Sequence, residues 1–163
     1  MVLRAMRGAL NRLPNLQLWC CYSTTELLPA MKKLIEGDGI LRDHVHLLGT
    51  VAHSDIEHLA RAADFFVAAS HWEGSGFALI EALACGLTPI VTDIPSFRWI
   101  TGDAAIGGLV PIGDDAAMAD QLVNLAAVPH EVRRARVLDH FARQLSFDAV
   151  GRQLRHAYEM VLT

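Results

Sequence analysis

Short apolar runs alternate with helical segments along the first two thirds of the chain. Strands are predicted near residues 16–22, 45–48, 65–69, 89–92 and 108–111. Between them, apolar residues at helical spacing predict helices near 24–36, 54–62, 76–85 and 95–100. Strands that alternate with helices imply crossover connections, which pack on the faces of a parallel sheet. The sequence therefore predicts an α/β fold with a doubly wound parallel sheet.

Helical patterns also begin and end the chain. Residues 3–13 have helical apolar spacing and run straight into the first predicted strand, whereas a doubly wound domain usually opens with a strand. We therefore expect the first strand to be absent. The C-terminal helices are predicted from Asp114 to about 127, from Pro129, and from 147 to 162, with the last one packing on its own core. Without repeats or a low-complexity linker, residues 1–163 are expected to form a single domain.

Two local patterns predict details of individual helices. Ser54 and Glu57 match a capping box at the start of the second predicted helix. The arginines at 133, 134 and 136 share a helix with acidic residues and indicate a solvated face.

Composition excludes several classes of protein. Hydrophobic residues make up 52% of the chain and charged residues 20%, which is typical of a globular protein. The formal net charge is −4, whereas a protein that binds nucleic acid usually carries excess positive charge, so the composition does not indicate nucleic-acid binding. No apolar stretch reaches the roughly 18 residues of a transmembrane segment, and the first residues lack a signal-peptide core. A cytoplasmic location follows as the default expectation.

The cysteines and histidines do not predict a metal site. Cys20 and Cys21 are adjacent in a predicted strand, so their side chains should point to opposite faces. With Cys85 they form an odd set without metal-ligand spacing, which indicates reduced, mostly buried thiols. His44 and His46 alternate on one strand face, but two ligands without a third partner do not make a zinc site.

The segment from Glu73 to Glu81 carries most of the functional information. Gly74 and Gly76 predict a tight loop in which the backbone can approach a ligand closely. Glu81 is the only charged side chain of the helix that follows, and a lone carboxylate among apolar side chains is costly unless something donates a hydrogen bond to it. A polyhydroxyl ligand across the helix N-terminus would supply that donor. Two simpler interpretations stay open: Glu73 as a solvated loop carboxylate, and Glu81 as a partly buried residue bonded to the backbone.

Residues 70–86 resemble the pattern of two glutamates separated by seven residues in the retaining glycosyltransferase family 4, or group 1. Further family segments resemble residues 45–51, 60–67, 88–95 and 107–114, and the likeness runs from about residue 5 to the end. The resemblance implies the Rossmann-like, C-terminal, nucleotide-sugar-binding half of a GT-B fold. It also implies that an N-terminal acceptor-binding domain is missing from the chain.

The resemblance implies roles for individual residues. Glu73 would be the catalytic residue, beside the donor sugar near its reacting carbon, and Glu81 would accept hydrogen bonds from the ribose hydroxyls. The other implied donor-binding residues are Ser75, Gly76, Phe77 and Ala78, with Gly49, Thr50 and Val51 near the nucleobase. The implied reaction is retaining transfer from a nucleoside-diphosphate sugar, with neither a cofactor nor a metal. A helix N-terminus suits this ligand because it offers free amides and a favourable dipole to phosphate.

The chain departs from the family pattern in three places. The arginine and lysine that bind the diphosphate after the first strand are not in place, and residues 21–25 lack the usual glycine. A glutamate common in the family is absent from residues 95–100. We therefore expect the isolated chain to be inactive. The alternative is a non-catalytic nucleotide-binding or interaction module of the same fold. A nucleotide-sugar epimerase of this fold is a weaker alternative, because the glutamate pattern counts against it.

Overall fold

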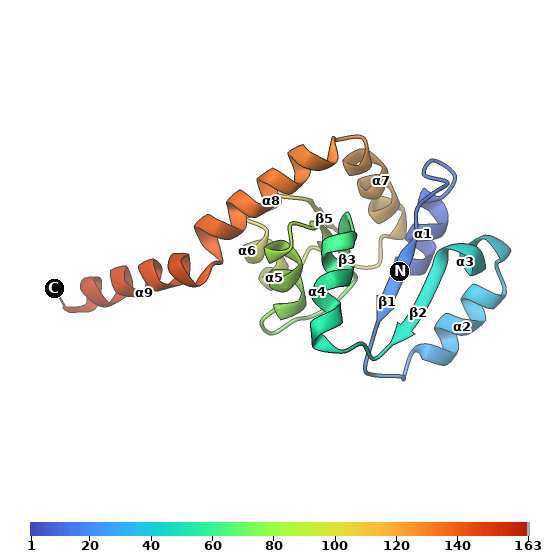
Figure 1. Ribbon diagram of the computed structural model, residues 1–163, viewed down its shortest axis with the longest axis horizontal. Helices are drawn as coiled ribbons and strands as arrows, with labels where there is room; N and C mark the ends of the chain where they lie inside the picture. The colour runs from blue at the N-terminus through green and yellow to red at the C-terminus, as the bar shows by residue number, and fades with distance from the viewer. Residues whose placement is uncertain (163) are drawn as a thin grey trace.

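The computed structural model describes residues 1–162 as an alternation of helices and strands (Figure 1). In chain order the elements are α1 (Val2–Ala9), β1 (Leu18–Cys21), α2 (Leu28–Glu36), α3 (Gly39–His44), β2 (Val45–Gly49), α4 (His53–Ala62), β3 (Phe65–Ala68), α5 (Phe77–Ala84), β4 (Thr88–Thr92), α6 (Pro95–Ile100), β5 (Gly108–Val110), α7 (Asp115–Ala126), α8 (His130–Gln144) and α9 (Phe147–Leu162). All five predicted strands are present close to their expected bounds.

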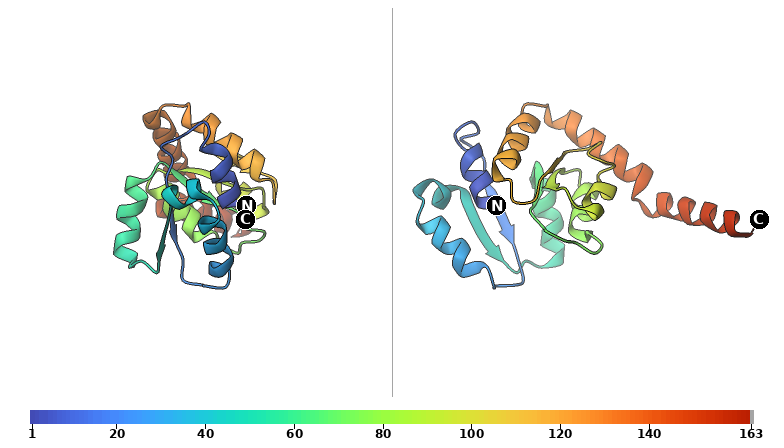
Figure 2. Two further views of the ribbon diagram at one scale, coloured as in Figure 1. Left: turned by 90° about the vertical axis from the view of Figure 1, so that its right-hand side faces the viewer. Right: turned by 180° about the vertical axis from the view of Figure 1, so that it is seen from behind.

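The strands pair in parallel, as the alternation with helices predicts. They form two separate ladders instead of the single sheet that we expected. In the first ladder, β1 pairs with β2 and Leu18 lies opposite Val45. In the second, the order is β3-β4-β5, with Val67 opposite Ile90 and Ile90 opposite Gly108. The α/β class with parallel strands is confirmed, and helices lie around both groups of strands (Figure 2).

The two faces of β4 bury separate parts of the core. Ile90 packs in a cluster with Ala5 of α1 and Met118 of α7. Its neighbour Val91 packs in another cluster, which includes Phe97 of α6. Adjacent strand residues point to opposite faces, so helices must cover β4 on both sides. Every residue of β4 is buried, and this strand anchors the second ladder.

Local signals explain where the first helices begin. The helix expected from residue 24 starts at Leu28, because Pro29 fits the first helical turn. Helix α3 was not expected, and Asp38 caps it by accepting hydrogen bonds from the amides of Ile40 at 2.9 Å and Leu41 at 3.3 Å.

The expected capping box at the start of α4 is wrong. Ala52 is the N-cap of this helix, so Ser54 already lies inside the helix and its side chain does not cap it. Glu57 pairs with Arg61, one turn further along α4.

The expectation of a solvated arginine face on α8 is also wrong for two of its members. Arg133 is only 7% exposed, and its guanidinium lies 4.3 Å from the ring centre of Phe65. It donates hydrogen bonds to Thr88 Oγ1 at 3.2 Å and to the carbonyl oxygen of Val128 at 3.1 Å. Arg134 donates to the carbonyl oxygen of Cys85 at 2.5 Å. Arg133 therefore holds α8 against the second ladder, and Arg134 holds it to the C-terminal end of α5.

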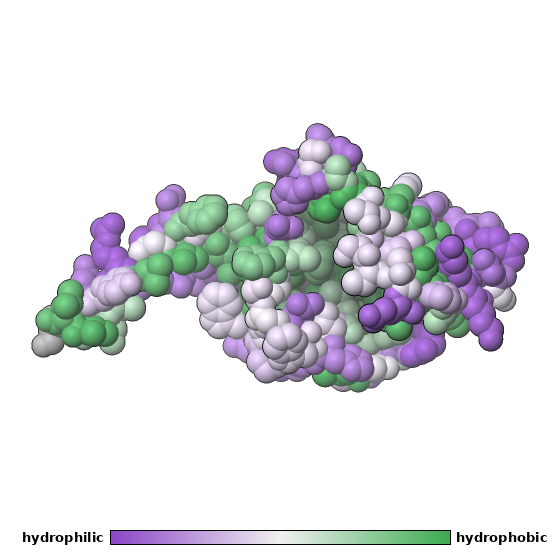
Figure 3. All heavy atoms as spheres, turned by 90° about the horizontal axis from the view of Figure 1, so that it is seen from below, coloured by the Kyte–Doolittle hydropathy of each residue, from purple (hydrophilic) through white to green (hydrophobic). Residues whose placement is uncertain are grey.

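Helix α9 does not pack on the core, contrary to expectation. It projects from the rest of the molecule, and hydrophobic atoms are visible towards its C-terminal end (Figures 1 and 3). Phe147 is 99% exposed and Val161 is 83% exposed, while Ala149 is buried at its start. None of the helices within residues 1–162 combines the length and apolar character needed to cross a membrane.

Candidate functional site

The loop between β3 and α5 holds Glu73 just beyond the third strand, where it was expected. Glu73 is half-buried, and the hydroxyl of Ser70 donates a hydrogen bond to its Oε1 at 2.9 Å. The carbonyl oxygen of Ser70 in turn accepts a hydrogen bond from Thr92 Oγ1 at 2.5 Å. Thr92 is fully buried at the end of β4. A carboxylate in a surface loop is therefore oriented by the buried scaffold.

Gly76 ends this loop, and only glycine fits its geometry. Its φ of 61° and ψ of 33° lie in the left-handed region, and it is the N-cap of α5. A Cβ at this position would lie 2.7 Å from Ile100 Cδ1, which is too close for two carbon atoms. Gly74 is different, because a Cβ there would meet Trp72 at an ordinary 3.7 Å.

The first amides of α5 are available to a ligand. No side chain caps this helix, and its first turn contains no acidic residue. Within the described residues, the amides of Phe77 and Ala78 have no hydrogen-bond partner, whereas that of Leu79 donates to the carbonyl oxygen of Gly76 at 3.0 Å. Ser75, Phe77 and Ala78 are exposed. Free amides combined with the positive end of the helix dipole favour an anion.

Glu81 lies one turn further along α5 and is exposed. It shares a helix face with Phe77 and Ala78, which precede it by four and three residues. Leu79 and Leu83 occupy the buried face. The expectation of a carboxylate surrounded by apolar side chains is therefore wrong, because water can solvate Glu81. Its position nevertheless continues the exposed surface that begins at the helix N-terminus.

The segment Gly49–Val51 lies at the carboxyl end of β2. Gly49 adopts a φ of 71°, and its carbonyl oxygen accepts a hydrogen bond from the amide of Tyr22 at 2.9 Å. Thr50 Oγ1 donates to the carbonyl oxygen of Tyr22 at 3.5 Å. The segment is therefore held to the end of β1. Like the Glu73 loop it follows the carboxyl end of a strand, but it belongs to the other ladder, and no hydrogen bond within residues 1–162 joins it to Glu73 or Glu81.

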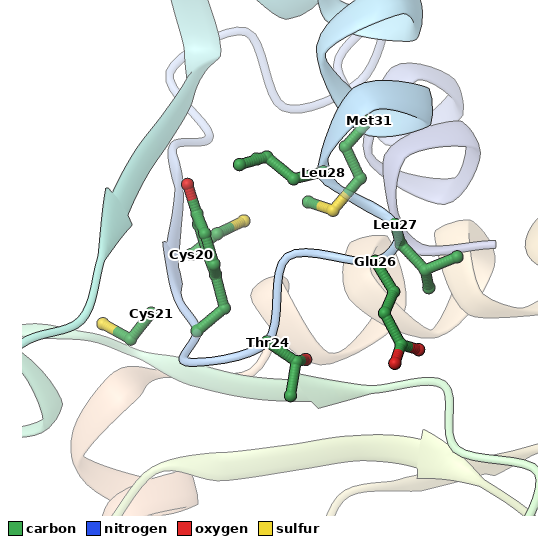
Figure 4. A pocket seen from close by; sticks show the side chains of 8 residues that line it. Cys20, Cys21, Thr24, Glu26, Leu27, Leu28 and Met31 are labelled. Carbon is green, nitrogen blue, oxygen red and sulfur yellow. The ribbon is translucent and has the colours of Figure 1, made fainter.

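A small cavity that the sequence did not predict lies at the carboxyl end of β1 (Figure 4). Its volume is about 280 Å³, and its lining residues are Cys20, Cys21, Tyr22, Thr24, Glu26, Leu27, Leu28 and Met31. The helical spacing of Leu28 and Met31 is the signal that could have placed them on one wall.

The two adjacent cysteines of this cavity point in opposite directions, as expected (Figure 4). The Cys20 side chain is directed towards Leu28 and Met31, and burial followed by the neighbouring Cys21 raises the pKa of its thiol. Cys20 and Cys85 are half-buried free thiols, while Cys21 is exposed. The expectation of mostly buried thiols is therefore wrong for Cys21.

The two histidines flanking the start of β2 belong to a surface hydrogen-bond network. Gln17 bonds His44 Nδ1 at 3.1 Å and His46 Nε2 at 2.7 Å. The ring of His46 stacks on Trp19, with 4.2 Å between ring centres. Within the part of the chain that the structure describes, no group of three or more His, Cys, Asp or Glu side chains is placed to hold a metal ion.

Comparison with known proteins identifies the class to which this fold and site belong. Residues 26–136 match the family model of glycosyl transferases group 1, so the chain belongs to that family. The match includes the Glu73 loop and all of α5. The resemblance inferred from the two glutamates, to the C-terminal domain of a group 1 glycosyltransferase with the GT-B fold, is thereby confirmed.

Two of the relatives are named as mannosyltransferases. The chain is 32% identical over 98% of its length to a phosphatidyl-myo-inositol mannosyltransferase of Mycobacterium leprae, of which it covers 44%. It is 34% identical over 76% of its length to a GDP-mannose:cellobiosyl-diphosphopolyprenol alpha-mannosyltransferase of Xanthomonas oryzae, of which it covers 33%. The chain thus spans less than half the length of these relatives.

Solved structures show the same fold at lower identity. The sucrose-phosphate synthase of Thermosynechococcus elongatus matches 99% of the chain with a TM-score of 0.78 and 21% identity, over 42% of its own length. The pneumococcal O-GlcNAc transferase, solved with UDP and GlcNAc, matches 98% of the chain with a TM-score of 0.77 and 21% identity, over 32% of its length.

Proposed function

We propose that this chain is the donor-binding part of a retaining glycosyltransferase that takes a sugar from a nucleoside diphosphate. The observation that carries the proposal is the order of polar groups along one path, which is half-buried at its first residue and exposed along α5. The path starts at Glu73, continues over the free amides of Phe77 and Ala78, and reaches Glu81. Sugar, diphosphate and ribose follow one another in the same order in a nucleoside-diphosphate sugar.

Each group on this path has a chemical role in the proposal. Negative charge develops on the departing diphosphate during transfer, and fixed amide dipoles at a helix N-terminus stabilise that charge. Glu81 accepts hydrogen bonds from the ribose hydroxyls, which anchors the nucleoside. Glu73, oriented by Ser70, contacts the sugar near its anomeric carbon. Gly49, Thr50 and Val51 contact the nucleobase.

The relatives suggest which donor to test first. Both relatives described above are named as mannosyltransferases, and the Xanthomonas protein is named for GDP-mannose. We therefore propose GDP-mannose as the donor, with transfer completed in a longer enzyme that includes an acceptor-binding domain. Three free cysteines fit a reducing compartment, and we propose a cytoplasmic location on that ground.

Isothermal titration calorimetry of the 163-residue chain tests donor binding. GDP and GDP-mannose should bind weakly, with a free energy of about −4 kcal/mol, which corresponds to the millimolar range. Guanosine, which lacks the phosphates, should lose the contacts to the amides of Phe77 and Ala78 and bind more weakly than GDP. UDP serves as the matched control for the base, because it keeps the diphosphate.

Two results would contradict the proposal. The first is equal affinity for GDP and guanosine, which would mean that the start of α5 does not contact the diphosphate. The second is that none of the four ligands (GDP, GDP-mannose, guanosine and UDP) binds at millimolar concentration. Formation of a glycoside by the purified 163-residue chain would refute the assignment of acceptor contacts to another domain.

A further inference from the structure

A second small cavity lies at the amino ends of β4 and β5. Its volume is about 180 Å³, and its lining residues are Thr88, Ala104, Ala105, Ile106, Gly107, Leu125, Val128, Arg133, Arg136 and Val137. Thr88 is the first residue of β4, whereas Thr92, which holds the Glu73 loop, is the last. The four residue steps between them span about 13 Å, so the cavity is separate from the candidate donor site.

Two arginines give this cavity a positive charge. Arg133 and Arg136 are three residues apart on α8, which places them on the same face of the helix. None of the residues that line the cavity is acidic. Asp139, the next acidic residue of α8, forms an ion pair with Arg143 at 2.8 Å. Among residues 1–162, Arg136 has neither an ion pair nor a hydrogen bond, so its charge is available to a ligand.

The guanidinium group of Arg133 is buried but keeps an unused donor. Its Nε and Nη1 donate hydrogen bonds to the carbonyl oxygen of Val128, to Thr88 Oγ1 and to the carbonyl oxygen of Asp64. Its Nη2 lies 3.7 Å from Asp64 Oδ1, which is too far for a hydrogen bond. No fully buried side-chain nitrogen or oxygen of the described residues lacks a hydrogen bond, so Nη2 must be accessible from outside. It can therefore donate to a bound anion.

Asp64 neutralises the charge of Arg133 only in part. Its side chain is 58% exposed, and the same carboxylate oxygen also bonds His130 Nδ1 at 2.8 Å. Exposed ion pairs are weak because water and salt screen them. The cavity therefore keeps a net positive potential from the two arginines.

Two neutral groups add donors to the same cavity. Thr88 is 2% exposed, and its Oγ1 accepts a hydrogen bond from Arg133, which leaves the hydroxyl hydrogen for a further acceptor. The amide of Gly107 has no hydrogen-bond partner in the described part of the chain. Beside it, Ala104 adopts a φ of 65° although it is not glycine. Residues held in this region cost free energy and cluster at ligand sites.

The size of the cavity and its donors define the class of ligand. Pockets for drug-sized ligands have volumes of roughly 300–1,000 Å³, so a cavity of about 180 Å³ is too small for a nucleotide sugar. Guanidinium groups match the oxygen geometry of phosphates and carboxylates. Two guanidinium groups, a hydroxyl and an amide suit the four oxygens of phosphate better than the two of a carboxylate. We propose that this cavity is a second binding site, for a small oxyanion with the chemistry of inorganic phosphate.

Titration of the 163-residue chain with inorganic phosphate, followed by two-dimensional NMR at constant ionic strength, tests the proposal. The amide signal of Gly107 should shift saturably, with a Kd in the millimolar range, and acetate should bind more weakly. Arg136→Met should raise the Kd for phosphate roughly tenfold or more, because it removes a charge-assisted contact. This residue is exposed, so the variant should fold. Arg152→Met, which removes the same charge from the exposed surface of α9, should leave the Kd unchanged.

Three results would overturn the proposal. The first is a Gly107 shift that does not saturate, and the second is an equal Kd for Arg136→Met and the unchanged chain. The third is saturable binding that shifts only the amides of Phe77 and Ala78, because phosphate would then bind at the start of α5. That third result would leave the proposed donor site intact. Acetate binding as tightly as phosphate would overturn the assignment to phosphate chemistry.

Thermal unfolding provides a second measurement. A ligand that binds only the folded state raises the unfolding temperature, and phosphate also stabilises proteins in general by exclusion from their surface. The rise in Tm with sodium phosphate, relative to sodium chloride at the same ionic strength, should therefore be larger in the unchanged chain and in Arg152→Met than in Arg136→Met. Equal rises in all three proteins would show a general salt effect and would overturn the proposal.

Discussion

The hydroxyl of Ser70 donates a hydrogen bond to Oε1 of Glu73 at 2.9 Å, so a residue at the start of the loop between β3 and α5 orients the carboxylate at its centre. Thr92 holds the same loop from β4 through the carbonyl oxygen of Ser70. The orientation of Glu73 therefore depends on a neutral side chain three residues away.

Replacing Ser70 by alanine tests this orientation. Ser70→Ala should destabilise the fold by about 0.5–1.5 kcal/mol, the usual contribution of one hydrogen bond. In a longer, active enzyme it should lower kcat more than it raises KM for the donor, because Glu73 would lose its fixed position. Ser70→Thr keeps the hydroxyl and should restore most of the loss. An equal loss in Ser70→Thr would contradict the role of the hydroxyl.

Gly76→Ala should destabilise the chain by about 1–3 kcal/mol, because alanine is strained at positive φ and its Cβ would overlap Ile100. Urea unfolding measures the change. Gly74→Ala is the matched control, two residues earlier in the same loop, and should change stability by less than about 0.5 kcal/mol. Similar losses in the two variants would mean that the left-handed conformation of Gly76 is not required.

Arg133→Met should destabilise the fold by roughly 1–3 kcal/mol. Methionine keeps much of the side-chain packing but leaves Thr88 and the carbonyl oxygen of Val128 without their donor. Arg136→Met, on the exposed part of the same helix, should be close to neutral. Equal unfolding midpoints for the two variants would contradict the structural role of Arg133.

The stability of the fold should depend on pH through the carboxyl group of Asp38. Burial favours a higher pKa for its carboxyl group, but hydrogen bonds from the amides of Leu41 and Ile40 and from Arg7 outweigh burial and lower the pKa below its usual value. The folded state therefore releases this proton more readily than the unfolded state. The stabilisation is complete above the unfolded pKa, near pH 4, and is lost as the pH falls through the lowered pKa.

Replacing Asp38 by asparagine isolates this effect. Asparagine still caps a helix, but it carries no charge to pair with Arg7. Thermal unfolding between about pH 2 and 6 should show a shallower acid decline for Asp38→Asn than for the unchanged chain. Parallel curves over this range would show that the Asp38 carboxylate makes no pH-dependent contribution.

Much of the fold was predictable because its signals are local. Apolar runs place β3 and β4 within a residue or so of their observed ends, and Glu73 just beyond β3, with Gly86 and Pro95 on either side of β4. Strand pairing depends on residues far apart in the sequence. The apolar segments that predict the strands therefore could not show that β1 and β3 do not pair. Helix α3 was missed because its six residues run directly into β2.

The sequence proposes the residues of the candidate site but does not predict their surroundings. The spacing of Glu73 and Glu81 directs attention to the loop after β3 and to α5, yet it gives no sign that Glu81 is exposed to solvent. The same limit applies to Arg133, because a helical charge pattern says nothing about Phe65, which is far away in sequence and close in space. The Ser70–Glu73 hydrogen bond depends on a loop conformation that Thr92 fixes from another strand.

The central claim is that Glu81 contacts the nucleoside and Glu73 the sugar. Calorimetry with GDP tests it directly in three variants, Glu81→Gln, Glu73→Gln and the control Glu131→Gln on the exposed start of α8. Glu81→Gln should weaken GDP binding by roughly 1–3 kcal/mol, because a charged acceptor becomes neutral. Glu73→Gln and Glu131→Gln should leave GDP affinity nearly unchanged. Equal losses of GDP affinity in Glu81→Gln and Glu73→Gln, or no loss in Glu81→Gln, would contradict the assignment.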